Sequence, residues 1–238
     1  MEINGVKIEF LGHSGFLITC KEGKRIAIDP YNLSNNVDKA DLILITHSHY
    51  DHCSIKDIEK IKKPGTIIII PPDAQSKITK IKDIHMEIVE IDDEFEFSKI
   101  KIKAVPAYTI SKDAHPKSEG WLGFLIKIDG NNIIYHAGDT DNIPEMKNLT
   151  GHGKQGNHFT ALLPVSGIYV MDAEEAVEVA SFLSPDLCIP MHYGAGIAGT
   201  IEDAERFVKL CKGLGLNAVI LEKIWIFPLK NQILKQVQ

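Results

Sequence analysis

Three histidines and one aspartate lie within the six residues of the segment His47–His52. In an extended backbone, residues i and i+2 point to the same side, so His47 and His49 can converge on one ion. A helix that begins after them would turn Asp51 and His52 towards a neighbouring position. Imidazole nitrogen and carboxylate oxygen are ligands that Zn²⁺ and other borderline metals favour. The alternative is a hydrophilic loop with chance histidines, and it does not explain their place directly after an apolar run.

Two further residues of the same chemical types follow other apolar runs. Asp139 comes just after the predicted strand Ile133–His136, beyond a glycine that allows close approach, and His192 follows the predicted strand Leu187–Pro190. A lone histidine or aspartate is a weak signal, because most such residues face solvent or satisfy a local hydrogen bond. Here each shares the strand-end position of the first cluster. The sequence therefore predicts that Asp139 and His192 complete a metal site that begins in His47–His52.

Short apolar runs separated by turns predict the elements that position these side chains. The predicted strands are Val6–Leu11, Phe16–Cys20, Arg25–Asp29, Asp41–Thr46, Thr66–Ile70, Glu87–Ile91, Lys99–Val105, Leu122–Asp129, Ile133–His136, Ala161–Pro164, Leu187–Pro190, Ala218–Leu221 and Ile224–Phe227, and the predicted helices are Asp51–Lys63, Ala173–Leu183 and Ile201–Leu210. Each half reads as a meander followed by strand, helix and strand. This plan predicts an α/β fold, an αββα four-layer sandwich of two mixed β-sheets flanked by helices, in one domain spanning 1–238.

Composition narrows the class of protein. The 238 residues carry a formal charge of −6, which disfavours a dedicated nucleic-acid binder. The sequence has no apolar run of about 20 residues that would cross a membrane, and its first residues do not read as a signal peptide. Its four scattered cysteines read as reduced thiols. We therefore expect a cytoplasmic protein that acts on a small molecule and contacts neither membrane nor nucleic acid.

The motifs together resemble the metallo-β-lactamase superfamily, and within it a branch of metal-dependent hydrolases similar to the ascorbate-6-phosphate lactonase group. The matching segments cover most of the chain: Leu11–Phe16, Ile28–Pro30, the HxHxDH pattern of His47–His52, His136–Thr140 and Pro190–Tyr193. Their combination and order are specific for the superfamily and say little about the substrate. The resemblance implies the αββα fold and a two-metal active site.

The resemblance also implies which side chains hold the two divalent ions, which we expect to be Zn²⁺, with Mn²⁺ or Fe²⁺ as alternatives. It assigns His47 and His49 to the first ion, Asp51, His52 and His192 to the second, and Asp139 as a bridge between both.

One feature departs from the family pattern. Members of this branch usually carry a third histidine for the first ion soon after the strand equivalent to Lys101–Val105. Here that stretch reads Pro106–Ile110 and has no histidine, and the nearest one is His115. We expect the loop to fold His115 back onto the site as a ligand. Two alternatives stay open: the first site is incomplete, or His115 only contacts substrate.

Three other residues are candidates for supporting roles. The family places the loop that carries His13 near the site, where it would bond a substrate oxyanion or a ligand carboxylate. Asp29 would orient a ligand imidazole, and His136 would support the site or contact substrate. Each also has an ordinary interpretation: a loop histidine that caps backbone groups, a turn residue before Pro30, and a motif neighbour without a role of its own.

The implied reaction is hydrolysis by a metal-activated water. Asp51 would orient that water or protonate the leaving group. Two divalent cations outweigh the charge of two aspartates, so we expect a small polar or anionic ester, lactone or phosphodiester as substrate. Lys112 and Lys117, which flank His115, either extend that preference or are solvated loop lysines. The alternative function is a non-catalytic metal-binding or sensor protein on the same fold, and either kind of protein is compatible with a homo-oligomer.

Overall fold

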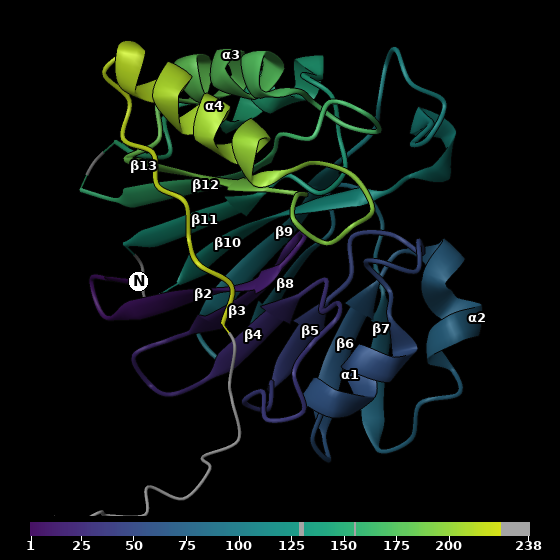
Figure 1. The fold of residues 1–238 in the computed structure, drawn as a ribbon. Helices are drawn as coiled ribbons and strands as arrows, with labels where there is room; N and C mark the ends of the chain where they lie inside the picture. The colour runs from purple at the N-terminus through teal and green to yellow at the C-terminus, as the bar shows by residue number, and fades with distance from the viewer. Residues whose placement is uncertain (129–130, 155, 225–238) are drawn as a thin grey trace, which may run out of the picture.

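The apolar runs of the sequence form two β-sheets that pack face to face, with helices on the outer side of each (Figure 1). This arrangement is seen in a computed structural model, which describes residues 1–128, 131–154 and 156–224. Within that part of the chain, the first sheet has seven strands in the order β1-β2-β3-β4-β5-β6-β7. Their bounds are β1 Glu2–Ile3, β2 Val6–Gly12, β3 Gly15–Thr19, β4 Arg25–Ile28, β5 Leu42–Leu44, β6 Thr66–Ile70 and β7 Ile84–Ile88. Strands β1 to β4 are antiparallel, and β4 to β7 run parallel.

The second sheet repeats this plan. Its described strands follow the order β13-β12-β11-β10-β9-β8, antiparallel from β8 to β11 and parallel from β11 to β13. Their bounds are β8 Glu94–Phe97, β9 Ile100–Pro106, β10 Leu122–Ile128, β11 Asn132–His136, β12 His158–Pro164 and β13 Leu187–Met191. Parallel neighbours need crossover connections, and these connections carry the helices to the outer faces.

The helices complete four layers. Helices α1 (Ile55–Ile61) and α2 (Gln75–Ile78) lie on the side of the first sheet, and α3 (Ala173–Leu183) and α4 (Ile201–Gly213) cover the second (Figure 1). Three short 3₁₀ segments, at Pro72–Ala74, Lys117–Glu119 and Pro144–Leu149, lie in connections. The predicted αββα sandwich of two mixed sheets is confirmed.

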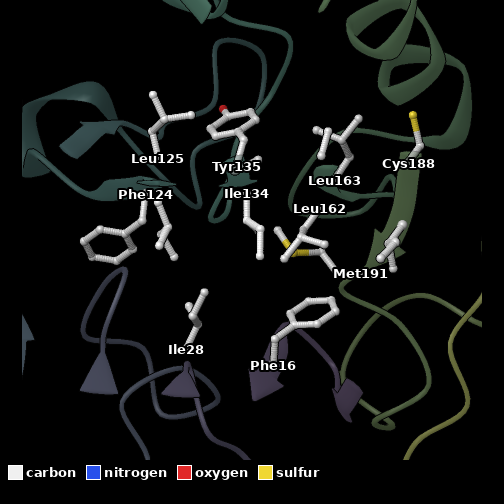
Figure 2. Close-up of a cluster of buried hydrophobic side chains, with 14 of the residues drawn as sticks. Phe16, Ile28, Phe124, Leu125, Ile134, Tyr135, Leu162, Leu163, Cys188 and Met191 are labelled. Carbon is white, nitrogen blue, oxygen red and sulfur yellow. The ribbon is translucent and has the colours of Figure 1, made fainter. Parts of the chain in front are cut away.

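Alternation along the strands builds the core between the sheets. Figure 2 shows side chains of the two sheets that point towards each other, namely Phe16, Ile28, Phe124, Ile134, Leu162 and Met191. Their neighbours on the second sheet point the opposite way, as Figure 2 shows for Leu125, Tyr135, Leu163 and Cys188. A second cluster, which includes Ile43, Ile58 and Ile68, packs α1 against the first sheet. The first sheet therefore packs apolar side chains on both of its faces, against the second sheet and against α1.

Three predicted elements differ most from the structure, and the short elements β1, β8 and α2 were not predicted. The predicted strand Ala218–Leu221 is wrong, because only Ala218 pairs, in a single parallel bridge to Cys188. The chain leaves β13 at this point and crosses to the first sheet, where Ile224 N donates to Phe10 O, so it cannot stay in register with either sheet. Of the predicted strand Ile224–Phe227, residues 225–227 lie outside the described residues.

The other two differences concern element bounds. The predicted strand Glu87–Ile91 is displaced, because β7 spans Ile84–Ile88 in register with β6. The predicted helix Asp51–Lys63 is too long: α1 is Ile55–Ile61, and the residues before it form a turn in which Cys53 N donates to His49 O. That turn leaves the side chains before α1 free to face the site. None of the described helices is both long and apolar enough to span a lipid bilayer.

Candidate metal centre

Each candidate side chain of the centre lies in a connection beyond the end of a strand. The segment His47–His52 follows β5, Asp139 follows β11, and His192 follows β13. Asp29 follows β4, His13 lies in the turn between β2 and β3, and His115 lies in the connection from β9 to β10. The structure brings these nine predicted residues together in one cluster, which is buried except at His49 and whose members are His13, Asp29, His47, His49, Asp51, His52, His115, Asp139 and His192.

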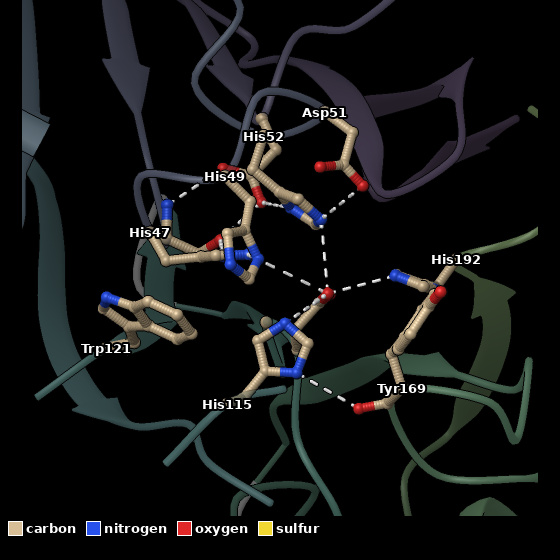
Figure 3. Close-up of polar contacts among 12 residues, drawn as sticks. His47, His49, Asp51, His52, His115, Trp121, Tyr169 and His192 are labelled. Carbon is tan, nitrogen blue, oxygen red and sulfur yellow. Dashed lines mark hydrogen bonds and ion pairs between the residues drawn. The ribbon is translucent and has the colours of Figure 1, made fainter. Parts of the chain in front are cut away.

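A single carboxylate oxygen forms the middle of the cluster. The Oδ2 atom of Asp139 lies 3.0 Å from Nε2 of His192, 3.2 Å from Nε2 of His115 and 3.3 Å from Nε2 of His52. A fourth imidazole, that of His47, has its Nε2 at 3.9 Å from the same oxygen. Figure 3 shows the side chains of these histidines pointing to one common centre. Four ring nitrogens from three segments of the chain, namely His47–His52 and the segments of His115 and His192, therefore share one carboxylate.

The opposite ring nitrogen, Nδ1, of each of these histidines is held from outside the centre. Nδ1 of His52 lies 2.8 Å from Asp29 Oδ2, and Nδ1 of His115 lies 3.1 Å from the carbonyl oxygen of Tyr169. A carboxylate and a carbonyl only accept, so these two nitrogens carry the proton. Nδ1 of His47 lies 2.9 Å from Thr46 Oγ1, and Nδ1 of His192 lies 2.8 Å from Ser166 Oγ. Metal-binding histidines are held in this manner, with the inward nitrogen left as the ligand atom.

Asp29 connects His47 and His52 within the cluster. Its Oδ1 accepts from the backbone N–H of Thr46 at 2.9 Å, and its Oδ2 accepts from the Thr46 hydroxyl at 2.6 Å and from His52. Because the Thr46 hydroxyl donates to Asp29, it accepts from Nδ1–H of His47. One buried carboxylate therefore sets the tautomers of His47 and His52.

The potential ligand atoms fall into two sets. His47, His49 and His115 form the first set, and Asp51, His52, His192 and His13 form the second. A third group, His47, His52 and Asp139, overlaps both sets, and within each group the atoms lie within 4.8 Å of one another. Several buried polar atoms here make no hydrogen bond within the described residues, namely His52 Nε2, His115 Nε2 and Asp139 Oδ1. Leaving buried polar groups unpaired is costly, and cations in both sets would satisfy these atoms. The donors present therefore fit divalent metal ions.

His13 supports the second set through Asp51. Its Nε2 lies 3.0 Å from Asp51 Oδ2, and its carbonyl oxygen accepts from the backbone N–H of His192 at 2.7 Å. Burial lowers the pKa of His13 to about 4, so the ring is neutral at pH 7 and donates to the carboxylate. Burial raises the pKa of Asp51, but the bond from His13 and the charge of His52 outweigh it and hold the pKa at about 2.

Electrostatics within the centre follow the same geometry. Burial holds the pKa of His47 well below its usual value, and the nearby His52 lowers it further. Burial also acts to lower the pKa of His52, but Asp139 and Asp29 outweigh it and raise that pKa well above its usual value. For Asp139, burial is outweighed by His192 and His52, which hold its pKa well below the usual range. The centre therefore holds an ionised Asp139 carboxylate among several imidazoles, and these are donor types that bind a divalent cation.

Sequence reasoning missed several residues that fix the cluster. The ring of Trp121 lies 4.8 Å from those of both His47 and His49 and 5.3 Å from that of His115, and its Nε1–H donates to Asp73 Oδ2 at 2.7 Å. Ser166 and the Tyr169 carbonyl were missed as well. A buried tryptophan and a backbone carbonyl have no sequence signature of this role, because any residue supplies the same carbonyl.

His136 lies beside the cluster and does not join it. Its Nε2 donates to Ser14 O at 2.9 Å, and its Nδ1 accepts from the Gly138 N–H at 3.2 Å, so the neutral ring has both nitrogens paired. Burial lowers the pKa of His136. The interpretation of His136 as a substrate contact therefore has no geometric support, and its hydrogen bonds indicate a structural role.

We expect His136 to make stability fall in acid. Its folded pKa lies below the unfolded value, so its contribution is full above about pH 6.5 and is lost as the pH falls towards the folded pKa. In His136→Gln, the pH slope of the free energy of unfolding between pH 7 and pH 5 should be shallower, by at most about 1.4 kcal/mol per pH unit. Urea denaturation at several pH values measures it. The exposed His85→Gln is the control, and an equal slope in both variants would contradict the assignment.

Gly138 allows the close approach that places Asp139. Its φ is +67°, and a Cβ there would lie 2.5 Å from the backbone oxygen of Leu122. Gly151 has a similar φ of +87° with open space around it. We expect Gly138→Ala to lower the free energy of unfolding by about 3 kcal/mol, and Gly151→Ala by about 1 kcal/mol, because only the first adds a clash to the backbone strain. Urea denaturation of both variants tests this, and equal losses would show that the Leu122 carbonyl moves away.

Comparison with known proteins places this centre in a family. Residues 7–192 match the family described as the Beta-lactamase superfamily domain. A UPF0173 metal-dependent hydrolase of Thermococcus onnurineus is 35% identical over 218 residues, which are 86% of this chain and 92% of that protein. A second, of Thermoplasma acidophilum, is 32% identical over 227 residues, 92% of this chain and 97% of that protein.

Solved structures agree with the sequence comparison. A crystal structure from Parabacteroides distasonis has 30% sequence identity and a TM-score of 0.77, covering 92% of this chain and 94% of its own. Igni18, described as a novel metallo hydrolase from Ignicoccus hospitalis, has 26% identity and a TM-score of 0.70, covering 92% of this chain and 95% of its own. The fold, the histidine and aspartate cluster and these relatives lead to one conclusion: the chain belongs to the metallo-β-lactamase superfamily and, within it, to the UPF0173 metal-dependent hydrolases.

Proposed function

We propose that this protein hydrolyses a small polar or anionic ester, lactone or phosphodiester with two divalent metal ions, most simply Zn²⁺. One observation carries the proposal: Asp139 Oδ2 faces Nε2 atoms of His47, His52, His115 and His192, while each Nδ1 is held from outside. The curated relatives named above are called metal-dependent hydrolases, which supports hydrolysis as the reaction. A lactone that carries a phosphate is one member of the proposed class.

The two sets of donors would each hold one ion. His47, His49 and His115 would bind the first, Asp51, His52 and His192 the second, and Asp139 would bridge them. When bound, two such ions lower the pKa of a shared water from about 15.7 towards 7 and polarise the carbonyl or phosphoryl oxygen.

The remaining chemistry belongs to side chains of this chain. Asp51 holds its carboxylate at the edge of the second set, where it would orient the attacking water and accept a hydrogen bond from it. His13 donates to Asp51 Oδ2 and so fixes the direction of that carboxylate. Trp121 packs on His47 and His49 and excludes solvent from one side of the first set. A dry, fixed set of donors makes these charges more effective than they would be in water.

Metal content and turnover test the proposal together. Plasma mass spectrometry of the purified, Zn²⁺-loaded protein should find two ions per chain, and His49→Ala should retain one. A chelator should abolish hydrolysis of 4-nitrophenyl esters or phosphodiesters, and added Zn²⁺ should restore it. Two bound ions with no turnover across such a panel would favour the alternative, a metal-binding or sensor protein on the same fold. A protein that binds no divalent ion would refute both.

A further inference from the structure

Three connections of the chain form or contact the metal centre, and each carries large apolar side chains on the surface. Tyr50 is 63% exposed and lies between His49 and Asp51. Ile110 is 64% exposed on the connection that carries His115. Ile168 is 60% exposed and Tyr169 is 45% exposed on the connection between β12 and α3. These four side chains are called the apolar rim below.

The connections that carry the apolar rim contact the cluster. The carbonyl of Tyr169 accepts from His115 Nδ1, and Figure 3 shows Tyr169 beside His115 and His192. Next to Ile110, the backbone N–H of Thr109 donates to the carbonyl oxygen of His115 at 2.7 Å. The ring of Tyr50 lies 6.1 Å from that of Tyr31, which lies 6.0 Å from the ring of His13. The backbone beside Ile110 and Tyr169 is therefore bonded to His115, and Tyr50 lies next to two ligand residues in the chain.

Exposed large apolar side chains are not spread evenly over the described surface. Among the described residues, eight large hydrophobic side chains are more than two-fifths exposed, and four of them form the apolar rim. The others are Met1, Ile88 at the end of β7, and Ile201 and Leu214 at the two ends of α4. Single exposed apolar side chains are ordinary, whereas several around a polar centre mark a binding surface.

The lysines nearest to His115 do not offset this apolar character. Lys112 Nζ lies 2.6 Å from Asp141 Oδ1 and 3.5 Å from Glu175 Oε2. Lys117 Nζ lies 2.7 Å from Glu145 Oε1. Both ammonium groups are thus committed to carboxylates, and the prediction that they extend a preference for anions loses its support. Attraction of a polar or anionic group is left to the centre itself.

We infer that the apolar rim receives an alkyl or aryl group of the substrate, so that the enzyme cleaves amphiphilic esters, lactones or phosphodiesters. The scissile polar group would lie at the metal centre, and the apolar group would lie over Tyr50, Ile110, Ile168 and Tyr169. This inference rests on the proposed function for the position of the polar group. It adds the class of substrate that the site would select, namely one whose alkyl or aryl group is larger than a methyl group.

Binding of n-alkylphosphonates to the Zn²⁺-loaded protein tests the inference without requiring turnover. The phosphonate provides the anionic head, and chains from methyl to octyl vary only the apolar arm. Isothermal titration calorimetry should show the dissociation constant falling about twofold per added methylene, as expected when a rim buries roughly half of the chain surface. In the double variant Ile110→Ser and Ile168→Ser, the affinity for methylphosphonate should stay and the gain with chain length should largely disappear.

Ile88→Ser is the matched control, because it removes an exposed isoleucine outside the apolar rim and should keep the full chain-length effect. A chain-length effect that is absent in the wild type, or unchanged in the double variant, overturns the inference. A wild-type dimer in light scattering that becomes monomeric in the double variant, with an unchanged chain-length effect, would show that the rim joins two copies and also overturns it. Chain-dependent binding without hydrolysis of any ester would refute only the proposed function.

Discussion

Replacing Asp139 by alanine is expected to lower kcat/KM by about 10³-fold or more, equivalent to about 4 kcal/mol of transition-state stabilisation. The reason is geometric. The Oδ2 atom of Asp139 is the one acceptor that His52, His115 and His192 all face, within 3.0 to 3.3 Å. In the proposed two-metal site, each ion would lose a ligand without Asp139, and the two sets would lose their connection. Steady-state kinetics on a 4-nitrophenyl ester or phosphodiester measures the loss.

Metal-linked stability gives a second readout of the same change. A metal present at 100 times its dissociation constant stabilises a folded protein by about 2.7 kcal/mol, and Asp139→Ala should lose most of this gain. Asp139→Asn keeps the shape of the side chain and removes its charge, so it separates loss of the ligand from loss of the fold. His85→Ala removes an exposed histidine and should keep both the ions and the activity. Undiminished metal-linked stabilisation in Asp139→Asn would contradict the bridging role.

The parts of the centre that follow strand ends were predictable from the sequence. Apolar runs locate the strands, and parallel strands end at a common edge, so His47, Asp139 and His192 were expected to meet there. The structure places them together, with Nε2 of His47 and His192 both facing Asp139. The proximity of these three residues was predicted correctly because it required only the ends of the strands β5, β11 and β13, and the hydrophobic pattern locates those strands.

The position of His115 could not be predicted in the same way. It lies in the middle of the long connection between β9 and β10, whose path depends on contacts with distant residues. Thr109 N donates to the His115 carbonyl at 2.7 Å, and Asp141 accepts from the backbone N–H of Ile110. The ring itself is fixed by the carbonyl of Tyr169, 54 residues further along the chain. Bonds of this range leave no local periodicity, so the sequence kept the alternatives for His115 open.

The start of helix α1 was mispredicted for a related reason. Ile55, Ile58 and Ile61 have helical spacing, which predicts a helix that extends back to Asp51. In the structure, the backbone between His49 and Cys53 forms a tight turn instead. The turn lets Asp51 and His52 face inward, where His13 and Asp29 hold them. Tertiary contacts with the centre therefore override the local preference for helix.

Asp29→Asn is expected to weaken metal binding about 10- to 100-fold while keeping the fold, because Asp29 orients histidines from both sets. The fully buried carboxylate accepts from the Thr46 backbone, from the Thr46 hydroxyl and from His52 Nδ1. The amide nitrogen of asparagine is itself a hydrogen-bond donor, so it would face at least one of these N–H or O–H donors with no acceptor between them. The response with the lowest cost is for His52 to move its proton to Nε2, the nitrogen that faces Asp139, where it blocks ligation.

Asp57→Asn is the matched control for this change. Asp57 is also buried and accepts from two backbone N–H groups, those of Asn32 and Leu33, but it lies outside the cluster. Both variants should lose about 1 to 3 kcal/mol in the free energy of unfolding, since each removes charged acceptors from buried donors. Only Asp29→Asn should change the Zn²⁺ dissociation constant measured by competition with a chelating dye. Equal metal affinity in the two variants would show that the histidines keep their tautomers without Asp29, and that their Nε2 atoms are oriented by packing against Trp121 and their neighbours alone.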